Sequence, residues 1–472
     1  MEDVKTILET LRLDPQRGLR ELECRLERRP GSDGGMSPSP EPAVNPDNWQ
    51  VVVDELLEML AVPEMQWTWF RPKEPREQKI SRQHKQAQLH ALRQVLQFTS
   101  VYDRYKLLDR VSLYYDERHP WSSKESAQAV HDILCQVEPS KDEIFVLMDG
   151  YVPMLRKFGK VSQHRTKVSA GGYRKSQNAA DGSIDTPLVG REPVGEDERI
   201  RTKYMSRIGS LAFLVDFLQG SDIEARWNVI FLLLLHYLDD HDVLVKSSAC
   251  EVLQTVVAKV NSPPSMKNII ARSSVAGLLL DTIAPCLLAL PSLTPPEESR
   301  MVLPTAYATA IAVLTASTGA QDELERQIAW LLVDYALPGV ARAGEYPQVC
   351  GALLSVVATE LLPRMGAFAA VVAKQTCYGV LELLRNPYTA FSPATIDAAV
   401  AVLEQLAAQG RGLASVRYDV LACLLKVAQR LHKYEVRDAD EVRAKIARFV
   451  LQLDLTQQER DRVQKFLLHL TQ

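Results

Sequence analysis

Residues Arg226 to Asp242 read RWNVIFLLLLHYLDDHD, an apolar run that ends in a cluster of two His and three Asp. Four interpretations fit such a stretch: a membrane segment, a metal site, a hydrolase motif, or one buried helix of a stack. The membrane interpretation fails on length, because apolar runs such as Val229 to Leu235 are far shorter than the roughly 20 residues that a bilayer requires. The N-terminal sequence also lacks the unbroken apolar core of a secretory signal.

The composition describes a large chain without a strong electrostatic field. Of its 472 residues 46% are hydrophobic, which is enough apolar material for two or three domains or for one elongated array. The formal net charge of −4 gives no global attraction to nucleic acid or to an anionic membrane. The seven cysteines are scattered without a CxxC pair, which is typical of free thiols in a reducing compartment. We therefore expect a cytoplasmic and nuclear protein.

Helix signals dominate the sequence. Several segments open with a capping box, in which an N-cap side chain and an acid three residues later satisfy free backbone N–H groups. These boxes are Ser122/Glu125, Ser140/Glu143, Ser221/Glu224, Thr294/Glu297, Asp438/Glu441 and Thr456/Glu459. Strand signals are nearly absent, because no Asn-Gly or Asp-Gly turn joins two alternating apolar runs. The sequence predicts an all-α fold.

Two stretches interrupt the helical pattern and divide the chain. Residues 30–47 are rich in Pro, Ser and Gly, which predicts a flexible link within an N-terminal helical region, 1–158. Residues 159–195 hold six glycines and few large apolar side chains, which predicts a flexible linker. The remainder, 196–472, reads as a series of helices with short loops. They are predicted near 198–219, 225–238, 243–260, 274–290, 297–316, 322–343, 346–360, 366–384, 394–409, 414–431, 438–452 and 457–471.

The spacing of these helices indicates a repeat. Taken in pairs they have a period of roughly 40 residues, the range of HEAT and armadillo repeats. After the acidic turn, Val245-Lys246-x-x-Ala249-x-x-x-Leu253 resembles the second helix of a HEAT unit. The sequence therefore predicts a HEAT- or armadillo-like α-solenoid, in which each helix pair buries its apolar face against the next. In that fold RWNVIFLLLL is a buried helix, and LDDHD is the turn and cap into the next helix.

The polar end of the opening stretch also allows a metal site. His236, Asp239 and Asp240 stand at i, i+3 and i+4 and can share one helical face, and His241 and Asp242 could complete the ligand set. His241-Asp242 also resembles the His-Asp pair of metal-dependent phosphohydrolases, which need a further His and a further Asp. Candidates for the further His are His131 and His164. We favour the simpler interpretation, in which the acids cap the next helix.

The common catalytic and nucleotide-binding motifs are absent, and one basic segment is ambiguous. The chain has no GxSxG elbow, no P-loop and no HExxH motif, so we expect neither a catalytic site nor a cofactor. Residues 67–85, WTWFRPKEPREQKISRQHK, join aromatics to six basic and two acidic residues and could touch RNA or an acidic partner. We favour aromatics packed into the N-terminal core and a solvated basic helix face, which makes nucleic acid a poor candidate partner.

Features along residues 190–400 resemble one family. In order they are Gly190-Arg191-Glu192-Pro193, then Arg226-Trp227 in a helix that runs into Leu238-Asp239-Asp240-His241, then APCLLALPSLTPPEES at 284–299, and Asn386-Pro387-Tyr388 before Ser392-Pro393. This order resembles the Tel-two-interacting protein two family, in a version typical of fungi. The chain departs from the family at Phe231-Leu232, where a Pro-Pro pair is expected.

The resemblance implies a non-enzymatic scaffold, a subunit of the TTT co-chaperone complex. The implied partners are Tel-two-interacting protein one and Tel-two and, indirectly, heat-shock protein ninety and the phosphatidylinositol-kinase-related kinases that the complex matures and stabilises. No catalytic residue comes with the family. Its motif positions, structural or partner-facing, are Trp227, Asp239, Asp240, His241, Pro285, Leu290, Pro291, Pro295, Asn386 and Pro387. Two alternatives remain: a HEAT-repeat transport or trafficking adaptor with the same architecture, and the His-Asp metal phosphohydrolase.

Overall fold

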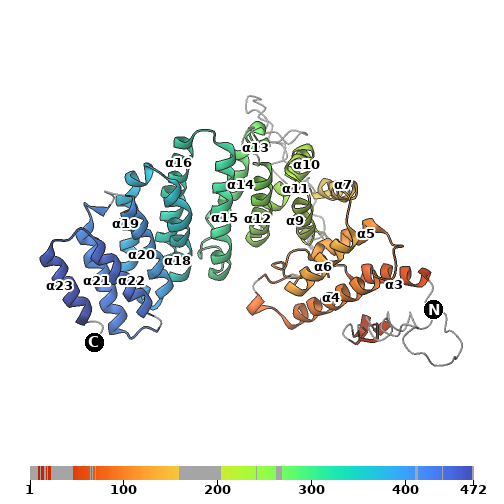
Figure 1. The fold of residues 1–472 in the computed structure, drawn as a ribbon, viewed down its shortest axis with the longest axis horizontal. Coiled ribbons are helices and arrows are strands. Elements are labelled where there is room, and N and C mark those ends of the chain that lie inside the picture. The colour runs from red at the N-terminus through yellow and green to blue at the C-terminus, as the bar shows by residue number, and fades with distance from the viewer. Residues whose placement is uncertain are drawn as a thin grey trace, which may run out of the picture. The chain divides into compact units, whose positions relative to one another are not determined.

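Helices are the only regular elements in the part of the chain that the structure describes (Figure 1). The structure is a computed structural model, and it describes residues 46–158 and 204–469 together with parts of 9–22. Short gaps within the two long ranges fall at 64, 66, 70, 241, 262–267, 410–412 and 438. The all-α prediction is confirmed. The chain forms two compact units, Met1–Tyr237 (unit 1) and Leu238–Gln472 (unit 2).

The predicted division of the chain falls on residues that the structure does not describe. The predicted linker, 159–195, and most of the predicted link, 30–47, lie outside the described residues. At its C-terminal end the predicted link is two residues too long, because helix α3 (Pro46–Met59) already begins at Pro46. A proline fits the first turn of a helix, where its missing N–H costs no hydrogen bond. The division into 1–158 and 196–472 stays a prediction.

Unit 1 packs its helices around a short turn, η2. Its elements are α3, η1 (Arg71–Lys73), α4 (Arg76–Val95), α5 (Arg104–Val111), η2 (Ser112–Tyr114), α6 (Lys124–Val137), α7 (Lys141–Phe158), α9 (Arg207–Phe217), α10 (Gly220–Ala225) and α11 (Trp227–Leu238), which reaches the unit boundary. α4 packs on α3 and α6, α5 packs on α3 and α7, and η2 contacts α5, α6 and α9. The turn therefore joins helices from both ends of the unit.

Tryptophans fill the core beside this turn. Trp121 is fully buried, and its indole N–H donates to the carbonyl of Leu113 at 2.8 Å. Trp67 and Trp69 are also buried, and their rings lie edge-on to that of Trp121 at 6.3 and 6.0 Å. The predicted packing of the 67–85 aromatics into the N-terminal core is confirmed for these two residues.

The basic face predicted for 67–85 is solvated only in part. Lys79 of α4 is exposed. Arg82 is not, because it pairs with Glu74, with Nη2 and Oε2 2.8 Å apart, and both side chains are largely buried. The sequence interpretation missed this pair, since nothing local shows that the chain folds Glu74 back onto α4. The number of cations free to meet an anionic polymer is correspondingly smaller.

The opening stretch is a buried helix, as predicted. α11 begins at Trp227, and most of its apolar side chains are buried. The buried ones are Trp227, Ile230, Phe231, Leu233, Leu234, Leu235, Tyr237 and Leu238. Within the described ranges, no helix combines the length and the apolar character needed to cross a membrane.

Unit 2 is a stack of helices that follow one another in chain order (Figure 1). Its elements are α12 (Val243–Val260), α13 (Ile269–Ser273), α14 (Ala276–Leu287), α15 (Pro296–Ser317), α16 (Gln321–Trp330), η4 (Leu331–Ala336), α17 (Leu337–Arg342), α18 (Pro347–Val356), η5 (Val357–Leu361), η6 (Leu362–Arg364), α19 (Phe368–Arg385), η7 (Pro387–Phe391), α20 (Pro393–Ala408), α21 (Arg417–Lys433), α22 (Asp440–Gln452) and α23 (Gln457–His469).

The helices of unit 2 form two layers. In the first layer α12 packs on α15, α15 on α18, α18 on α20 and α20 on α22. In the second layer α16 and α17 pack on α19, and α19 packs on α21. Across the layers α14 packs on α15, α17 on α18, α19 on α20 and α21 on α22. Each helix pair thus covers the apolar face of the next, which is the arrangement of an α-solenoid. Its assignment to the HEAT or armadillo type stays a prediction.

Two predicted helices, 322–343 and 346–360, contain wide π-turns. The first is α16, the π-turn η4 and α17, and the second is α18 followed by the π-turn η5. A proline stands two residues after the end of each π-turn, Pro338 after η4 and Pro363 after η5. A proline has no N–H for the carbonyl four residues earlier, and its ring crowds that carbonyl, so a wider turn relieves the contact. The prediction treated both segments as regular α-helix.

Candidate interaction surface

Trp227, the first predicted motif residue, fixes α11 inside unit 1. Its side chain is 3% exposed, and its ring stacks on Phe231 at 5.1 Å. Among the described residues, none accepts a hydrogen bond from its indole nitrogen. The neighbouring Arg226 pairs with Asp149 of α7 at 3.1 Å and lies over the ring of Phe145. The Arg-Trp motif therefore fastens α11 within unit 1.

The acidic turn after α11 caps the next helix. Asp240 Oδ1 accepts a hydrogen bond from the backbone N–H of Asp242 at 2.8 Å. Asp242 Oδ1 accepts from the N–H of Leu244 at 2.9 Å, which makes Asp242 the N-cap of α12. Asp239 is half-buried beside them. The predicted role of this turn as a helix cap is confirmed for Asp242.

The metal interpretation gains no support from the part of the chain that is described. His241 lies outside the described residues. Among those that are described, no group of three or more His, Cys, Asp or Glu side chains is placed to hold a metal ion. His236 is half-buried, and its ring packs edge-on against the ring of Tyr204 at 4.3 Å. His131 of α6 is exposed, and His164 falls in the undescribed segment.

The stretch 284–299 spans the end of α14, a tight connection and the start of α15. Leu290 is buried, and its carbonyl accepts from the N–H groups of Leu293 and Thr294 at 3.0 and 2.9 Å. The side chain of Leu293 points the other way and is 91% exposed. The predicted motif prolines are exposed or half-buried: Pro285, Pro291 and Pro295. This stretch therefore combines one structural anchor with an apolar tip at the surface.

The stretch 386–393 forms the connection between α19 and α20. Asn386 Oδ1 accepts from the N–H of Tyr388 at 3.1 Å and caps η7, whose first residue is Pro387. Tyr388 and Phe391 then expose 73% and 61% of their surface. Asn386 and Pro387 hold the turn, and the two aromatics after them face solvent.

Both motif stretches lie on the same edge of unit 2. Each is a connection from the second layer to the first, and hydrogen bonds join neighbours along this edge. Arg300 Nη1, near the start of α15, donates to Gln348 Oε1, in the first turn of α18, at 3.0 Å. Asn386 Nδ2 donates to the carbonyl of Gly344, in the neighbouring connection, at 3.5 Å. We call these four connections the loop edge: 288–295, 343–346, 386–392 and the described residues of 434–439.

Large apolar side chains gather on the loop edge. Those exposed there are Leu288, Leu293, Tyr346, Tyr388, Phe391 and Tyr434. The described connections of the opposite edge (318–320, 365–367, 413–416 and 453–456) contain no exposed large apolar side chain, although Tyr418 follows them at the start of α21. Exposed apolar residues gathered along one edge of a protein are typical of binding sites. The loop edge is the candidate interaction surface.

An open pocket of about 600 Å³ lies on this edge. It is lined by Phe391, Pro393, Ala394, Tyr434, Glu435, Val436 and Arg437. The rings of Phe391 and Tyr434 form its aromatic wall, 5.5 Å apart and tilted by 31°. Glu435 adopts a left-handed conformation with φ 47°, and its N–H donates to the carbonyl of His432 at 3.1 Å. This turn ends α21 and leaves Tyr434 beside Phe391.

Sequence reasoning named part of this surface and missed the rest. It found 284–299 and 386–393 but not Tyr434, because no local pattern marks a tyrosine that follows a helix as a pocket wall. Phe391 had a usable signal, since it is an aromatic residue between two prolines, Pro387 and Pro393, in a connection. The flanking prolines restrict the backbone of this connection, which favours an exposed position for the ring of Phe391.

The fold defines the class of the protein: an all-α protein whose second unit is a two-layer helical solenoid with an apolar loop edge. Comparison with known families then places it. A family model described as the Tti2 family matches residues 107–391, more than half of the chain. The chain belongs to the Tti2 family. The matched range includes Trp227, the acidic turn, 284–299 and the connection 386–391. No curated protein matches the chain.

Proposed function

We propose that the chain is a non-enzymatic scaffold subunit of the TTT co-chaperone complex. In this role it binds Tel-two-interacting protein one and Tel-two, and it supports chaperone-dependent maturation of phosphatidylinositol-kinase-related kinases. Heat-shock protein ninety and the kinases are indirect partners. The observation that carries the proposal is membership of the Tti2 family across 107–391.

The arrangement of unit 2 supports a binding role. A two-layer stack presents long ridges and aligned connections, which suit large protein partners better than small substrates. On the loop edge, Leu293 and Tyr388 come from the family-like stretches and are both largely exposed. Exposed apolar and aromatic side chains are the kind of anchor that dominates protein interfaces. We place the contact with the other subunits on this edge.

The proposed location is the cytoplasm and nucleus. The six cysteines that the structure describes are all free thiols, and five of them are buried. This state supports a reducing compartment. Fluorescence microscopy of the tagged full-length chain in its native cells tests the location, and retention in a membrane-bound organelle would contradict it.

The decisive experiment is an affinity purification of the tagged full-length chain from its native organism, with bound proteins identified by mass spectrometry. We expect near-equal recovery of the two other TTT subunits, with chaperone and kinases at lower levels. Recovery of nuclear-pore or vesicle-coat proteins in their place would favour a transport adaptor and contradict the proposal. Near-stoichiometric transition metal in the purified chain would favour the phosphohydrolase.

A further inference from the structure

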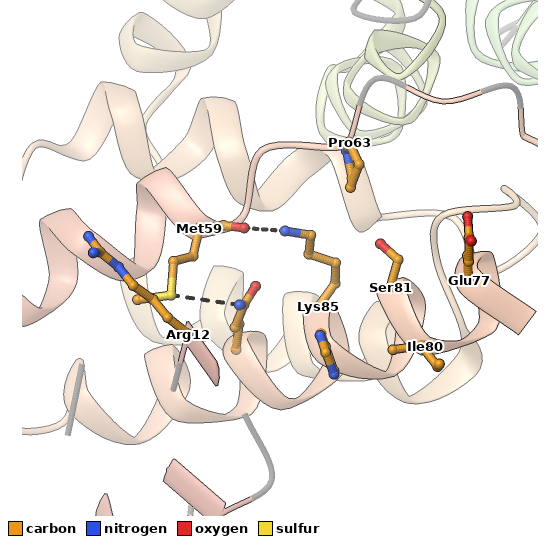
Figure 2. A pocket seen from close by; sticks show the side chains of 9 residues that line it. Arg12, Met59, Pro63, Glu77, Ile80, Ser81 and Lys85 are labelled. Atoms are coloured by element: carbon orange, nitrogen blue, oxygen red, sulfur yellow. Dashed lines mark hydrogen bonds between the residues drawn. The ribbon is translucent and has the colours of Figure 1, made fainter. Parts of the chain in front are cut away.

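Unit 1 contains an open pocket of about 500 Å³ along one face of α4 (Figure 2). α4 contributes residues at helical spacing: Glu77, Ile80, Ser81, His84, Lys85 and Gln88. Met59 and Pro63, at and after the end of α3, close the other side with Arg12. The volume suits a small ligand or a single side chain of a partner. The pocket lies outside the residues 107–391 that match the family.

The central cation of this pocket is Lys85. Its ammonium donates to the carbonyl of Met59, at the C-terminal end of α3 (Figure 2). Within the described residues no carboxylate forms an ion pair with it. An ammonium has three donors, so two remain for a group inside the pocket. The basic neighbours are Arg12, which pairs with Glu55, and His84; the acid of the pocket is Glu77, which is exposed.

The surroundings of Lys85 disfavour its charge. Burial lowers the pKa of Lys85 to about 8, and burial also lowers the pKa of His84. A carboxylate beside the ammonium would have the opposite effect on its pKa, because an opposite charge favours the charged form. Buried charges in proteins are normally paired. Lys85 is half-buried and lines an open pocket, so an anion in this pocket could reach its ammonium and offset the cost of its partial burial.

The other walls of the pocket limit what that counter-ion is attached to. Met59, Pro63 and Ile80 are apolar, and Ile80 exposes 39% of its surface. These side chains favour contact with an apolar group over contact with water, because burying apolar surface lowers the free energy. Ser81, one helical turn from Lys85, offers a hydroxyl donor within the same pocket (Figure 2).

We propose that this pocket binds an oxyanion, a carboxylate or a phosphate, carried on a short apolar group, with Lys85 as its counter-ion. The anion accepts hydrogen bonds from the Lys85 ammonium, and the apolar group covers Met59, Pro63 and Ile80. This site is independent of the loop edge and of the proposed TTT partners.

Thermal unfolding of the full-length protein tests the proposal. Hexanoate, inorganic phosphate and hexanol are compared at constant ionic strength and pH 7. Hexanoate should raise the melting temperature of wild type by roughly 1–3 °C at saturating concentration, because a ligand that binds only the folded state stabilises it. Lys85→Gln, which removes the charge and keeps a shorter neutral hydrogen-bond donor, should lose this shift. Lys79→Gln, which removes an exposed lysine from the same helix, should keep it.

The outcomes separate cleanly. A larger shift with phosphate than with hexanoate identifies a phosphate-type ligand, and the reverse identifies a carboxylate with an apolar group. No shift with either anion, an equal shift in Lys85→Gln, or a hexanol shift as large as that of hexanoate overturns the proposal.

A second readout does not depend on a variant. Acetic anhydride acetylates neutral amines, and mass spectrometry follows each lysine separately. At pH 8, saturating hexanoate or phosphate should slow the acetylation of Lys85 by roughly threefold or more, because a bound ligand protects its site. The acetylation rate of Lys79 should stay unchanged. Equal slowing of both lysines would indicate a bulk effect of the anion and contradict a site at Lys85.

Discussion

The ring of Phe391 lies 5.5 Å from the ring of Tyr434, although the two residues belong to connections of successive helix pairs. Phe391 ends η7 before α20, and Tyr434 follows α21 before α22. The pocket between them therefore exists only when these two helix pairs are stacked. A partner that fills this pocket would recognise the stacked helix pairs and not a single linear segment of the chain.

The loop edge should be required for partner binding and not for folding. Leu293→Asp combined with Tyr388→Asp places charges on two largely exposed apolar positions. We expect more than tenfold lower recovery of the proposed partners, because interface anchors contribute about 2 kcal/mol or more each. The melting temperature should change by less than about 2 °C, since exposed positions have little effect on stability.

Val371→Asp is the matched control for the loop edge. Val371 is 78% exposed but lies in the first turn of α19, at the opposite end of that helix from the loop edge. It should leave partner recovery unchanged. If the control lowers recovery as much as the double variant does, a general effect of surface charge explains the loss and the loop edge has no special role.

Trp227 should contribute strongly to the stability of unit 1. Trp227→Ala empties a buried site against Phe231 and should lower the free energy of unfolding by about 3–5 kcal/mol, measured by urea denaturation. Trp330 of unit 2 is 44% exposed. Trp330→Ala should lower the free energy of unfolding of unit 2 by less than about 1.5 kcal/mol. Equal losses in the two variants would contradict the structural role of Trp227.

His119 should make unit 1 less stable in mild acid. Burial lowers the pKa of His119 to about 4, from 6.5 in the unfolded chain. Because the unfolded chain binds the proton more tightly, the full stability is present above pH 6.5. Stability falls as the pH drops from about 6.5 towards 4, by up to about 3 kcal/mol.

Urea unfolding at pH 7 and pH 5, followed by tryptophan fluorescence, measures this loss. Five of the six tryptophans belong to unit 1, and the ring of His119 stacks on one of them, Trp121, at 5.0 Å, so the fluorescence reports chiefly on this unit. His119→Phe has no proton to bind and should show a smaller loss between the two pH values. Identical losses in wild type and His119→Phe would show that other groups cause the acid sensitivity.

The acidic turn should act through its helix cap. Asp242→Ala removes the acceptor for the Leu244 N–H and should lower the free energy of unfolding by about 1 kcal/mol. Asp242→Asn keeps an acceptor oxygen and should recover most of that loss. If Asn is as destabilising as Ala in urea denaturation, the cap is not what Asp242 contributes.

Local sequence signals predicted most helices of the solenoid. α12 occupies 243–260 as predicted, because its apolar residues recur at helical spacing after an acidic cap. Two capping boxes are confirmed: Ser140 with Glu143, and Thr456 with Glu459. In both, the box and the first helical turn are consecutive, so the sequence contains all the atoms that the cap needs.

Tertiary contacts moved another predicted cap. Ser122 was expected to cap α6, but its hydroxyl donates to the carbonyl of Tyr114 at 2.9 Å, and Ser123 caps the helix instead. Two adjacent serines offer the same local signal. The choice between them depends on a carbonyl that only the folded unit brings close.

The candidate surface was predictable only in pieces. The stretches around Leu290 and Asn386 are distinctive as sequence, yet their position on one edge depends on how helix pairs stack. The cation at Lys85 was not singled out, because its enclosure depends on the end of α3 folding back over α4. Periodicity reports which face of a helix is apolar; it does not report which connections end up adjacent.

The stacking of unit 2 also has a mechanical consequence. Because each helix pair packs chiefly on the next, the pairs from α12 to α22 act as links in series. A pulling force applied to the two ends of this unit passes through every link in turn. The weakest single link then sets the load that the unit bears, and extra contacts elsewhere do not raise it.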